Sequence, residues 1–233
     1  MALRILLVGY GKMGQTIARL APEYGAEIAG VVDPHSPEHN RTIDAPEWAS
    51  VDVAIDFTTP DAVAANVGAL ARSGRNIVLG TTGWQQHEAE LREAVAAAGV
   101  GIVAAPNFST GVLLFEAVVA RAAALFSAQP EFGAWVHELH HAMKKDAPSG
   151  TALKLKQTME EAGFSRAIDV AANRVGFVPG THTIGFDGPS ESITLTHMAR
   201  DRAVFARGAL TAARWIHGRR GWYDMQDVLG LRG

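Results

Sequence analysis

The chain has 233 residues, of which 48% are hydrophobic and 19% are charged, with 21 Lys and Arg against 24 Asp and Glu. A net charge of −3 lacks the basic excess with which proteins displace counterions from nucleic acids or anionic membranes, so neither is expected as a partner. The absence of Cys excludes disulfide scaffolds, Cys-ligated zinc, iron–sulfur clusters and cysteine nucleophiles. Because the apolar stretches stop well short of about 20 residues and the first residues lack a signal-peptide pattern, we expect a cytoplasmic protein.

The first hundred residues alternate between short apolar runs and segments with helical spacing. The apolar runs predict buried strands over residues 4–8, 28–32, 51–56, 76–79 and 101–105. Helices are predicted from about Met13 to Ala21, over 61–73 and over 87–98, whereas the polar, Pro-rich segment 34–50 predicts a loop. Strands that are apolar throughout and alternate with helices form parallel sheets covered on both faces. The fold class is therefore α/β, beginning with a Rossmann-like dinucleotide-binding domain.

A glycine-rich turn follows the first predicted strand and opens the first predicted helix. The turn reads Gly9-Tyr10-Gly11-Lys12-Met13-Gly14, a pattern that lets backbone N–H groups approach a pyrophosphate at the positive end of a helix. Asp33 ends the second strand at the spacing at which a carboxylate meets a ribose 2′-hydroxyl. A carboxylate would repel a 2′-phosphate, so NADH is favoured over NADPH, although His35, Arg41 or Lys12 could still reach that phosphate.

Three further strand ends carry small, hydroxylated or aromatic residues. They read Asp56-Phe57-Thr58-Thr59, Gly80-Thr81-Thr82-Gly83 and Ala105-Pro106-Asn107-Phe108-Ser109. Ligands of open α/β sheets bind beyond the carboxyl ends of the strands, so these segments are expected to line the nicotinamide and its ribose. The alternative for Thr59 and Ser109 is that each only begins a helix.

A polar cluster in the middle of the chain admits two interpretations. His137-Glu138-Leu139-His140-His141 matches the zinc-hydrolase signature H-E-x-x-H, which requires a helix to bring His137 and His141 together, and His182 or His197 as a third ligand. The same residues are equally consistent with a strand. In a strand His137, Leu139 and His141 would share one face, and Glu138 and His140 the other.

The second interpretation is an anion-binding pocket. His140, His141 and Lys144 precede Asp146-Ala147-Pro148-Ser149-Gly150-Thr151, which predicts a turn and a helix start with free N–H groups. Histidine can also donate a proton near neutral pH. This arrangement suits a small substrate with carboxylates, whereas the alternative is a solvated basic loop.

With these residues in view, the chain resembles the dihydrodipicolinate reductase family of the diaminopimelate route to lysine. The most specific match is the run His140-His141-x-x-Lys144-x-Asp146-Ala147-Pro148-Ser149-Gly150-Thr151-Ala152. Residues 80–83, 107–112 and 223–229 agree with the family as well. The chain departs from the family pattern in two places. Its first glycine turn is one residue shorter than usual, and its segment 34–50 is short. The short segment leaves the choice between NADH and NADPH open.

The resemblance implies roles for individual residues. His140 would donate the proton and Lys144 would be the second catalytic cation, while no metal is implied. The substrate carboxylates would be held by His141, Gly150, Thr151 and Arg202. The cofactor would be held by Gly9, Tyr10, Gly11, Lys12, Met13, Gly14, Asp33, Phe57, Gly80, Thr81, Thr82, Pro106, Asn107, Phe108 and Phe205.

The rest of the chain predicts a second α+β domain with a mixed sheet. Its elements are helices over 111–126 and 149–162, the strand that contains His140, and strands over 181–185, 192–197 and 203–205. Residues 1–107 and 207–233 would bind the dinucleotide, and residues 108–206 would bind substrate and, by the resemblance, form a homotetramer. The expected activity is NAD(P)H-dependent reduction of 4-hydroxy-tetrahydrodipicolinate with loss of water. The alternatives are a non-catalytic dinucleotide-binding regulator and a zinc hydrolase.

Overall fold

A computed structural model describes residues 1–39 and 42–232 and divides into two compact units. The first unit comprises Met1–Thr110 and Ala203–Gly233, and the second comprises Gly111–Arg202. These boundaries differ by a few residues from those expected at 107/108 and 206/207, because helices begin at Thr110 and at Ala203. Arg41, considered above as a contact to a 2′-phosphate, lies outside the described residues.

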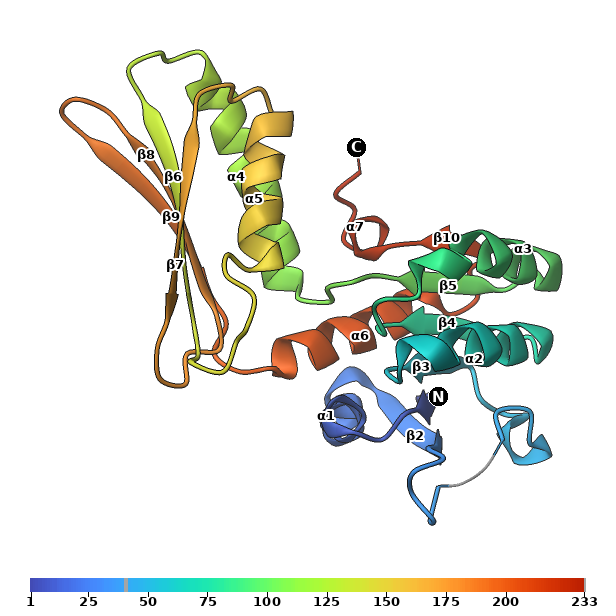
Figure 1. The fold of residues 1–233 in the computed structure, drawn as a ribbon. Coiled ribbons are helices and arrows are strands. Elements are labelled where there is room, and N and C mark those ends of the chain that lie inside the picture. The colour runs from blue at the N-terminus through green and yellow to red at the C-terminus, as the bar shows by residue number, and fades with distance from the viewer. Residues whose placement is uncertain (40–41, 233) are drawn as a thin grey trace. The chain divides into compact units, whose positions relative to one another are not determined.

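The first unit is a parallel six-stranded sheet with strand order β10-β5-β4-β3-β1-β2, flanked by helices (Figure 1). Its strands are β1 (Leu3–Val8), β2 (Ala26–Val32), β3 (Val53–Asp56), β4 (Asn76–Leu79), β5 (Gly101–Ala104) and β10 (Gly221–Tyr223). Its helices are α1 (Lys12–Leu20), α2 (Pro60–Arg72), α3 (Glu88–Ala98), α6 (Ala203–Ile216) and α7 (Met225–Val228). The Rossmann-like fold expected from the alternating periods is confirmed.

Two features of this unit differ from the sequence prediction. Residues 203–205 begin α6 and do not form a strand, because Ala206, Ala209, Leu210 and Ala213 continue at helical spacing into a buried face. Segment 34–50 is a loop as expected, but it contains a short helical turn, Pro46–Trp48, whose Trp48 is buried. The Trp48 ring fills the space above Gly30, where an added Cβ would lie 2.1 Å from it.

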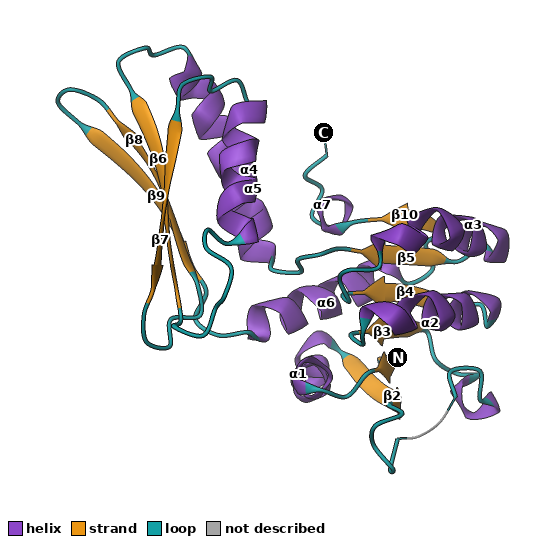
Figure 2. Ribbon diagram, viewed as in Figure 1, coloured by secondary structure: helices purple, strands orange, loops and turns teal. Residues whose placement is uncertain are grey.

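The second unit is a mixed four-stranded sheet with order β7-β6-β8-β9, covered on one face by α4 and α5 (Figure 2). Its elements are α4 (Thr110–Ser127, whose first residue belongs to the first unit), β6 (Gly133–His140), α5 (Gly150–Glu161), β7 (Ile168–Arg174), β8 (Thr181–Asp187) and β9 (Ser192–Met198). Strands β6 and β7 are parallel, and the other pairs are antiparallel. The mixed sheet was expected, but β7 was not, because its sequence IDVAANR alternates only weakly between apolar and polar residues.

Alternation along the strands gives this sheet two different faces. One face places Ala134 and Val136 of β6 beside Ile184 and Phe186 of β8, packed against α4 and α5. Further along the same face the apolar residues give way to Glu138, His140 and His182. The opposite face carries Trp135, His137, Thr183, Thr196 and Met198, and the Trp135 ring lies directly on Gly185. The polar cluster therefore lies at one end of the packed face.

Helix α4 is more apolar than the sequence prediction allowed. Its 18 residues are long and apolar enough to cross a membrane by length and composition alone, although they include Glu116 and Arg121. Within the second unit, Val119 and Ala123 of this helix are buried in the hydrophobic core. Leu114, Val118 and Leu125 are exposed.

Candidate active site

The glycine turn in the first unit uses each of its three glycines for a different reason. Gly9 has a φ of +92°, and a Cβ there would lie 2.5 Å from the carbonyl oxygen of Phe57. A Cβ on Gly14 would lie 2.3 Å from the carbonyl oxygen of Gly9, so helix and strand can approach closely only without it. Gly11 is the N-cap of α1, and beyond its own neighbours along the chain no heavy atom of the described residues lies within 4 Å of its Cβ position. The turn therefore leaves open space where a pyrophosphate would meet the helix N-terminus.

Asp33 already organises this turn. One of its carboxylate oxygens accepts a hydrogen bond from the Tyr10 backbone N–H at 2.8 Å, and the other accepts one from His35 N–H at 2.9 Å. Each oxygen retains a lone pair, since a carboxylate has about four acceptor sites. The Tyr10 ring packs edge-on against His39, with ring centroids 4.9 Å apart. The geometry leaves Asp33 able to accept from a ribose hydroxyl beside the turn.

The buried residue Asp56 lies at the end of β3, in a segment that the sequence predicted to line the nicotinamide. Its buried carboxylate accepts hydrogen bonds from the hydroxyls of Thr58 and Thr81 at 2.7 and 2.9 Å and from Asn66 at 2.9 Å. Burial raises the pKa of Asp56, and these hydrogen bonds oppose that rise. The Thr81 side chain is thereby directed into the protein. Asp56 thus connects the segment after β3 with the segment after β4 through hydrogen bonds.

The other predicted cofactor contacts lie at the same edge of the sheet. The Phe57 ring packs on Gly80, where a Cβ would come within 2.2 Å of it, and against Phe108 with centroids 5.9 Å apart. Thr82 and Pro106 are exposed, whereas Phe108 is buried and Asn107 accepts a hydrogen bond from Ser109 N–H at 2.8 Å. Phe205 is half-buried in the first turn of α6. A pocket of about 340 Å³ at this edge is lined in part by Thr81, Pro106, Trp84 and Trp222.

The zinc-hydrolase interpretation is wrong for this chain. Residues 133–140 form a strand, so His137 and His141 do not meet on a helix face. The His137 ring lies on the open face of the sheet and contacts the Asn173 side chain at 2.7 Å. Glu138 and His140 instead share the packed face, as the strand alternative predicted.

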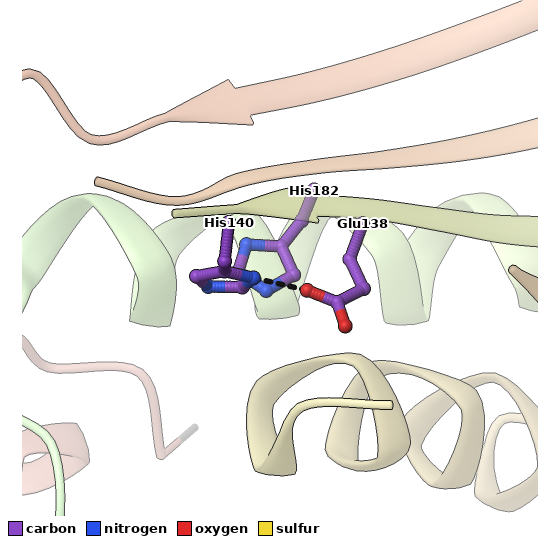
Figure 3. Close-up of side chains that lie close together, drawn as sticks. All are labelled: Glu138, His140 and His182. Atoms are coloured by element: carbon purple, nitrogen blue, oxygen red, sulfur yellow. Dashed lines mark hydrogen bonds and ion pairs between the residues drawn. The ribbon is translucent and has the colours of Figure 1, made fainter. Parts of the chain in front are cut away.

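A buried carboxylate, Glu138, is the centre of the polar cluster (Figure 3). One of its oxygens contacts Nδ1 of His140, and the other accepts hydrogen bonds from Arg174 at 2.7 Å and from the Ser149 N–H at 3.0 Å. The His140 and His182 rings meet edge-on with centroids 5.1 Å apart. Three neighbouring strands supply these side chains. Strand β6 carries Glu138 and His140, β7 carries Arg174, and β8 carries His182.

The surroundings favour different protonation states for the members of the cluster. Arg174, the Ser149 N–H and His140 hold the pKa of Glu138 below its usual value despite its burial, so it remains a carboxylate. Burial lowers the pKa of His140, and the charge of Glu138 opposes that change. Burial lowers the pKa of His182 to about 4, which keeps that ring neutral near pH 7. The charge of Glu138 favours protonation of both rings, but His140 is the ring that contacts the carboxylate directly.

The loop from His140 to α5 brings the predicted cations and the helix start together. The Lys144 ammonium contacts both oxygens of Asp146, at 2.8 and 2.9 Å. Lys144 and the Gly150 backbone N–H both lower the pKa of Asp146. Ser149 caps α5 by accepting a hydrogen bond from Ala152 N–H at 3.2 Å. Asp146 thus contacts the predicted second catalytic cation, Lys144, and one predicted carboxylate-binding group, the Gly150 N–H.

The predicted substrate contacts are at least partly exposed. His141 and Thr151 are half-buried, and Gly150 is exposed at the start of α5. Arg202 is exposed at the end of the second unit. The sequence prediction did not include Glu138, Arg174, Asp146 or His182 among the site residues. Strand alternation already placed Glu138 on the face of His140, whereas Arg174 and His182 reach it only through strand pairing.

A metal at this cluster would have to displace existing contacts. The ligand atoms of Glu138, His140 and His182 all lie within 4.8 Å of one another, close enough for one ion. Both oxygens of Glu138 already have partners, and one partner is the Arg174 guanidinium. A nearby cation opposes binding of another cation. The donor set fits a hydrogen-bonded carboxylate–histidine pair better than a metal centre.

Comparison with known proteins identifies relatives over the whole chain. Residues 3–108 match the model of the dihydrodipicolinate reductase N-terminus, and residues 111–229 match that of its C-terminus. The 4-hydroxy-tetrahydrodipicolinate reductase of Myxococcus xanthus is 38% identical over 99% of this chain and 98% of its own. That of Christiangramia forsetii is 33% identical over 97% and 98%.

Solved structures agree on the fold. A dipicolinate-bound dihydrodipicolinate reductase from Paenisporosarcina sp. TG-14 has a TM-score of 0.81 and 23% identity, covering 97% of this chain and 99% of that one. A probable dehydrogenase from Thermotoga maritima has a TM-score of 0.63 and 11% identity, covering 97% and 92%. The expected dinucleotide-dependent reductase is confirmed, and nothing in these relatives supports a regulator or a hydrolase. The chain belongs to the dihydrodipicolinate reductase family, whose reaction is a step of the diaminopimelate route to lysine.

Proposed function

We propose that this chain reduces 4-hydroxy-tetrahydrodipicolinate to tetrahydrodipicolinate with loss of water, and that NADH is its preferred reductant. The observation that supports this proposal most is the segment 140–151, in which His140, Lys144 and the start of α5 follow one another at the end of β6. A proton donor, a cation and a helix N-terminus are what a cyclic imine dicarboxylate requires.

The cofactor half of the proposal rests on the crevice of the first unit. The turn 9–14 would hold the pyrophosphate, since Gly11 leaves its approach open. Asp33 would accept from the ribose 2′-hydroxyl and repel a 2′-phosphate. Phe57, the backbone of 80–82 and residues 106–108 would line the nicotinamide, with Phe205 from α6 nearby. When bound, the nicotinamide supplies a hydride to the substrate ring.

The residues of the second unit would donate the proton, stabilise the negative charge that develops on the substrate and bind its carboxylates. Hydride addition pushes electrons toward the ring nitrogen, so His140 would donate a proton there and Lys144 would stabilise the developing negative charge. His141, Arg202 and the N–H groups of Gly150 and Thr151 would hold the two carboxylates. Lys144 and the Gly150 N–H must then leave Asp146, and loss of the Lys144–Asp146 pair costs little because it is partly exposed. A relative that binds dipicolinate, an aromatic dicarboxylate, fits this assignment.

The quaternary state and location complete the proposal. The open face of the β7-β6-β8-β9 sheet carries Trp135, Leu139 and Met198, which a second copy of the chain would cover in a homotetramer. We propose a cytoplasmic enzyme whose partner in the reaction is a small dicarboxylate, without a role for nucleic acid or a membrane.

One assay tests the proposal. Oxidation of NADH and of NADPH is followed at 340 nm with substrate made freshly by the preceding synthase reaction, using protein dialysed with and without EDTA. We expect oxidation of both cofactors, a larger kcat/KM with NADH, and no effect of the chelator. Oxidation of neither cofactor would refute the reductase, and activity lost to EDTA and restored by zinc would point to a metal at the cluster.

A further inference from the structure

We propose that Glu138 is a positioning residue that sets the protonation of His140 and fixes the start of α5. This inference rests on the proposed function, because it takes His140 as the proton donor and α5 as the carboxylate-binding helix. Glu138 would contact neither substrate nor cofactor. It would instead hold the proton donor His140 and the start of α5 in fixed positions relative to each other.

The contacts of the two carboxylate oxygens carry the first step. The oxygen that contacts Nδ1 of His140 is an acceptor only, so Nδ1 must be the donor and must carry a proton. The second acidic position of the ring, Nε2, lies beside Gly180, where an added Cβ would come within 2.9 Å of it. Glycine at 180 therefore keeps space next to the nitrogen from which a proton would leave. With Nδ1 protonated, Nε2 carries a proton only in the imidazolium.

The charges around His140 show why a buried carboxylate is needed. Lys144 from the following loop and Arg174 from β7 both oppose its protonation, and burial does so as well. His182 from β8 contacts its ring edge-on but is neutral near pH 7, and His197 from β9 adds its charge only when protonated. Glu138 is the negative group of the cluster that contacts the ring, and it is completely buried. Without the charge of Glu138, the protonated His140 ring would lose the carboxylate that stabilises it.

The second oxygen links this pair to α5. It accepts from the backbone N–H of Ser149, which is the N-cap of the helix, and from Arg174, which is itself bonded to the Asp146 carbonyl. The Ser149 hydroxyl in turn lies 3.3 Å from Nε2 of His182. One carboxylate thus fixes the proton donor and the first residue of the helix whose N–H groups would bind the substrate.

The test compares Glu138→Gln with Glu138→Asp and with a matched control, Glu116→Gln. Glu116 is a half-buried carboxylate of the same unit that binds Thr158 at 2.9 Å, away from the cluster. We expect E138Q to lower kcat by about 10²-fold with the Kd for NADH unchanged, and to move the basic limb of the kcat/KM profile down by about one pH unit or more. E138D keeps the charge, so its basic limb should stay closer to that of the unchanged protein, and E116Q should have no effect on either.

A second readout does not depend on turnover. Long-range ¹H–¹⁵N spectra of the imidazole rings, with the His140 signals assigned by their loss in His140→Gln, report tautomer and pKa directly. In the unchanged protein neutral His140 should be protonated on Nδ1. In E138Q the amide NH₂ faces that nitrogen, so the proton should move to Nε2 and the pKa should fall. If E138Q does not fold because Arg174 lacks a partner, the double variant E138Q/R174M removes both charges and allows the same titration.

The outcomes separate this inference from the proposed function. An unchanged tautomer and pKa of His140 in E138Q, or equal pH profiles for E138Q and E138D, would overturn the positioning role. A protein that oxidises neither NADH nor NADPH would overturn the reductase assignment for this site while leaving the titration of His140 readable. The expected pattern is an altered titration together with a kcat loss that binding does not explain.

Discussion

The two polar regions of the molecule are built in opposite ways. In the first unit, the crevice at the strand ends is formed by backbone. Gly9 and Gly14 allow close backbone approach because they have no Cβ, and Gly11 leaves open space at the helix N-terminus. In the second unit, the cluster around Glu138 is made of polar side chains, of which Glu138, His140 and His182 are buried. A backbone site suits a ligand shared by many enzymes, whereas a network of charged side chains suits one reaction.

The difference extends to what each region can tolerate. Backbone N–H groups at a helix start need only the correct local path of the chain, so the crevice is sensitive to added volume. A buried carboxylate needs every partner in place, because an unpaired charge in the interior is costly. The first region should therefore be damaged by enlarging residues, and the second by changing charge or protonation.

The largest effect is expected from removing the proton donor or its neighbouring cation. His140→Gln and Lys144→Ala should each lower kcat by about 10²–10⁴-fold, because proton transfer and charge stabilisation act on the reacting ring. NADH affinity, measured by fluorescence titration, should not change, since neither residue belongs to the unit that holds the glycine turn. A variant that is inactive because it no longer binds NADH would contradict the division of labour.

An intermediate effect is expected from adding one methyl group to the glycine turn. Gly14→Ala should destabilise the fold by about 3 kcal/mol, because its Cβ would meet the Gly9 carbonyl oxygen at 2.3 Å. Gly11→Ala is the matched control: it should leave the unfolding free energy nearly unchanged but weaken NADH binding by about tenfold or more, since its methyl group would occupy the approach to the pyrophosphate. Denaturant unfolding and NADH titration separate the two. An unchanged NADH affinity in Gly11→Ala would show that the open space at Gly11 has no role in binding.

The smallest effect concerns the pH dependence of stability. His182 has a folded-state pKa of about 4, below its unfolded value, so the unfolded chain takes up the proton first as the pH falls. Its contribution to stability is present above about pH 6.5 and is lost toward pH 4. Between pH 7 and pH 5 the loss amounts to about 2 kcal/mol. His182→Gln should flatten the curve of unfolding free energy by that amount, and an equally steep curve would assign the acid sensitivity to other groups.

The sequence alone was sufficient for the parts of the molecule that depend on local order. Apolar runs that alternate with helical spacing predicted the parallel sheet, and the turn 9–14 was located because a phosphate-binding turn is built from consecutive residues. Segment 140–151 was located for the same reason. Alternation along residues 133–140 even placed Glu138 on the face of His140, although its role was not recognised.

Only the tertiary structure could decide which distant residues meet. Arg174 and His182 reach Glu138 because β7 and β8 pair with β6 on either side, and neither strand register can be read from local sequence. Asp56 acquires its role when Thr58, Asn66 and Thr81 converge on it from different elements. Residues 203–205 were predicted as a strand because a short apolar run does not distinguish strand from helix until its burial partners are known. Local order therefore determined the elements and the motifs, whereas strand pairing determined the charge network that gives the motif around His140 its chemistry.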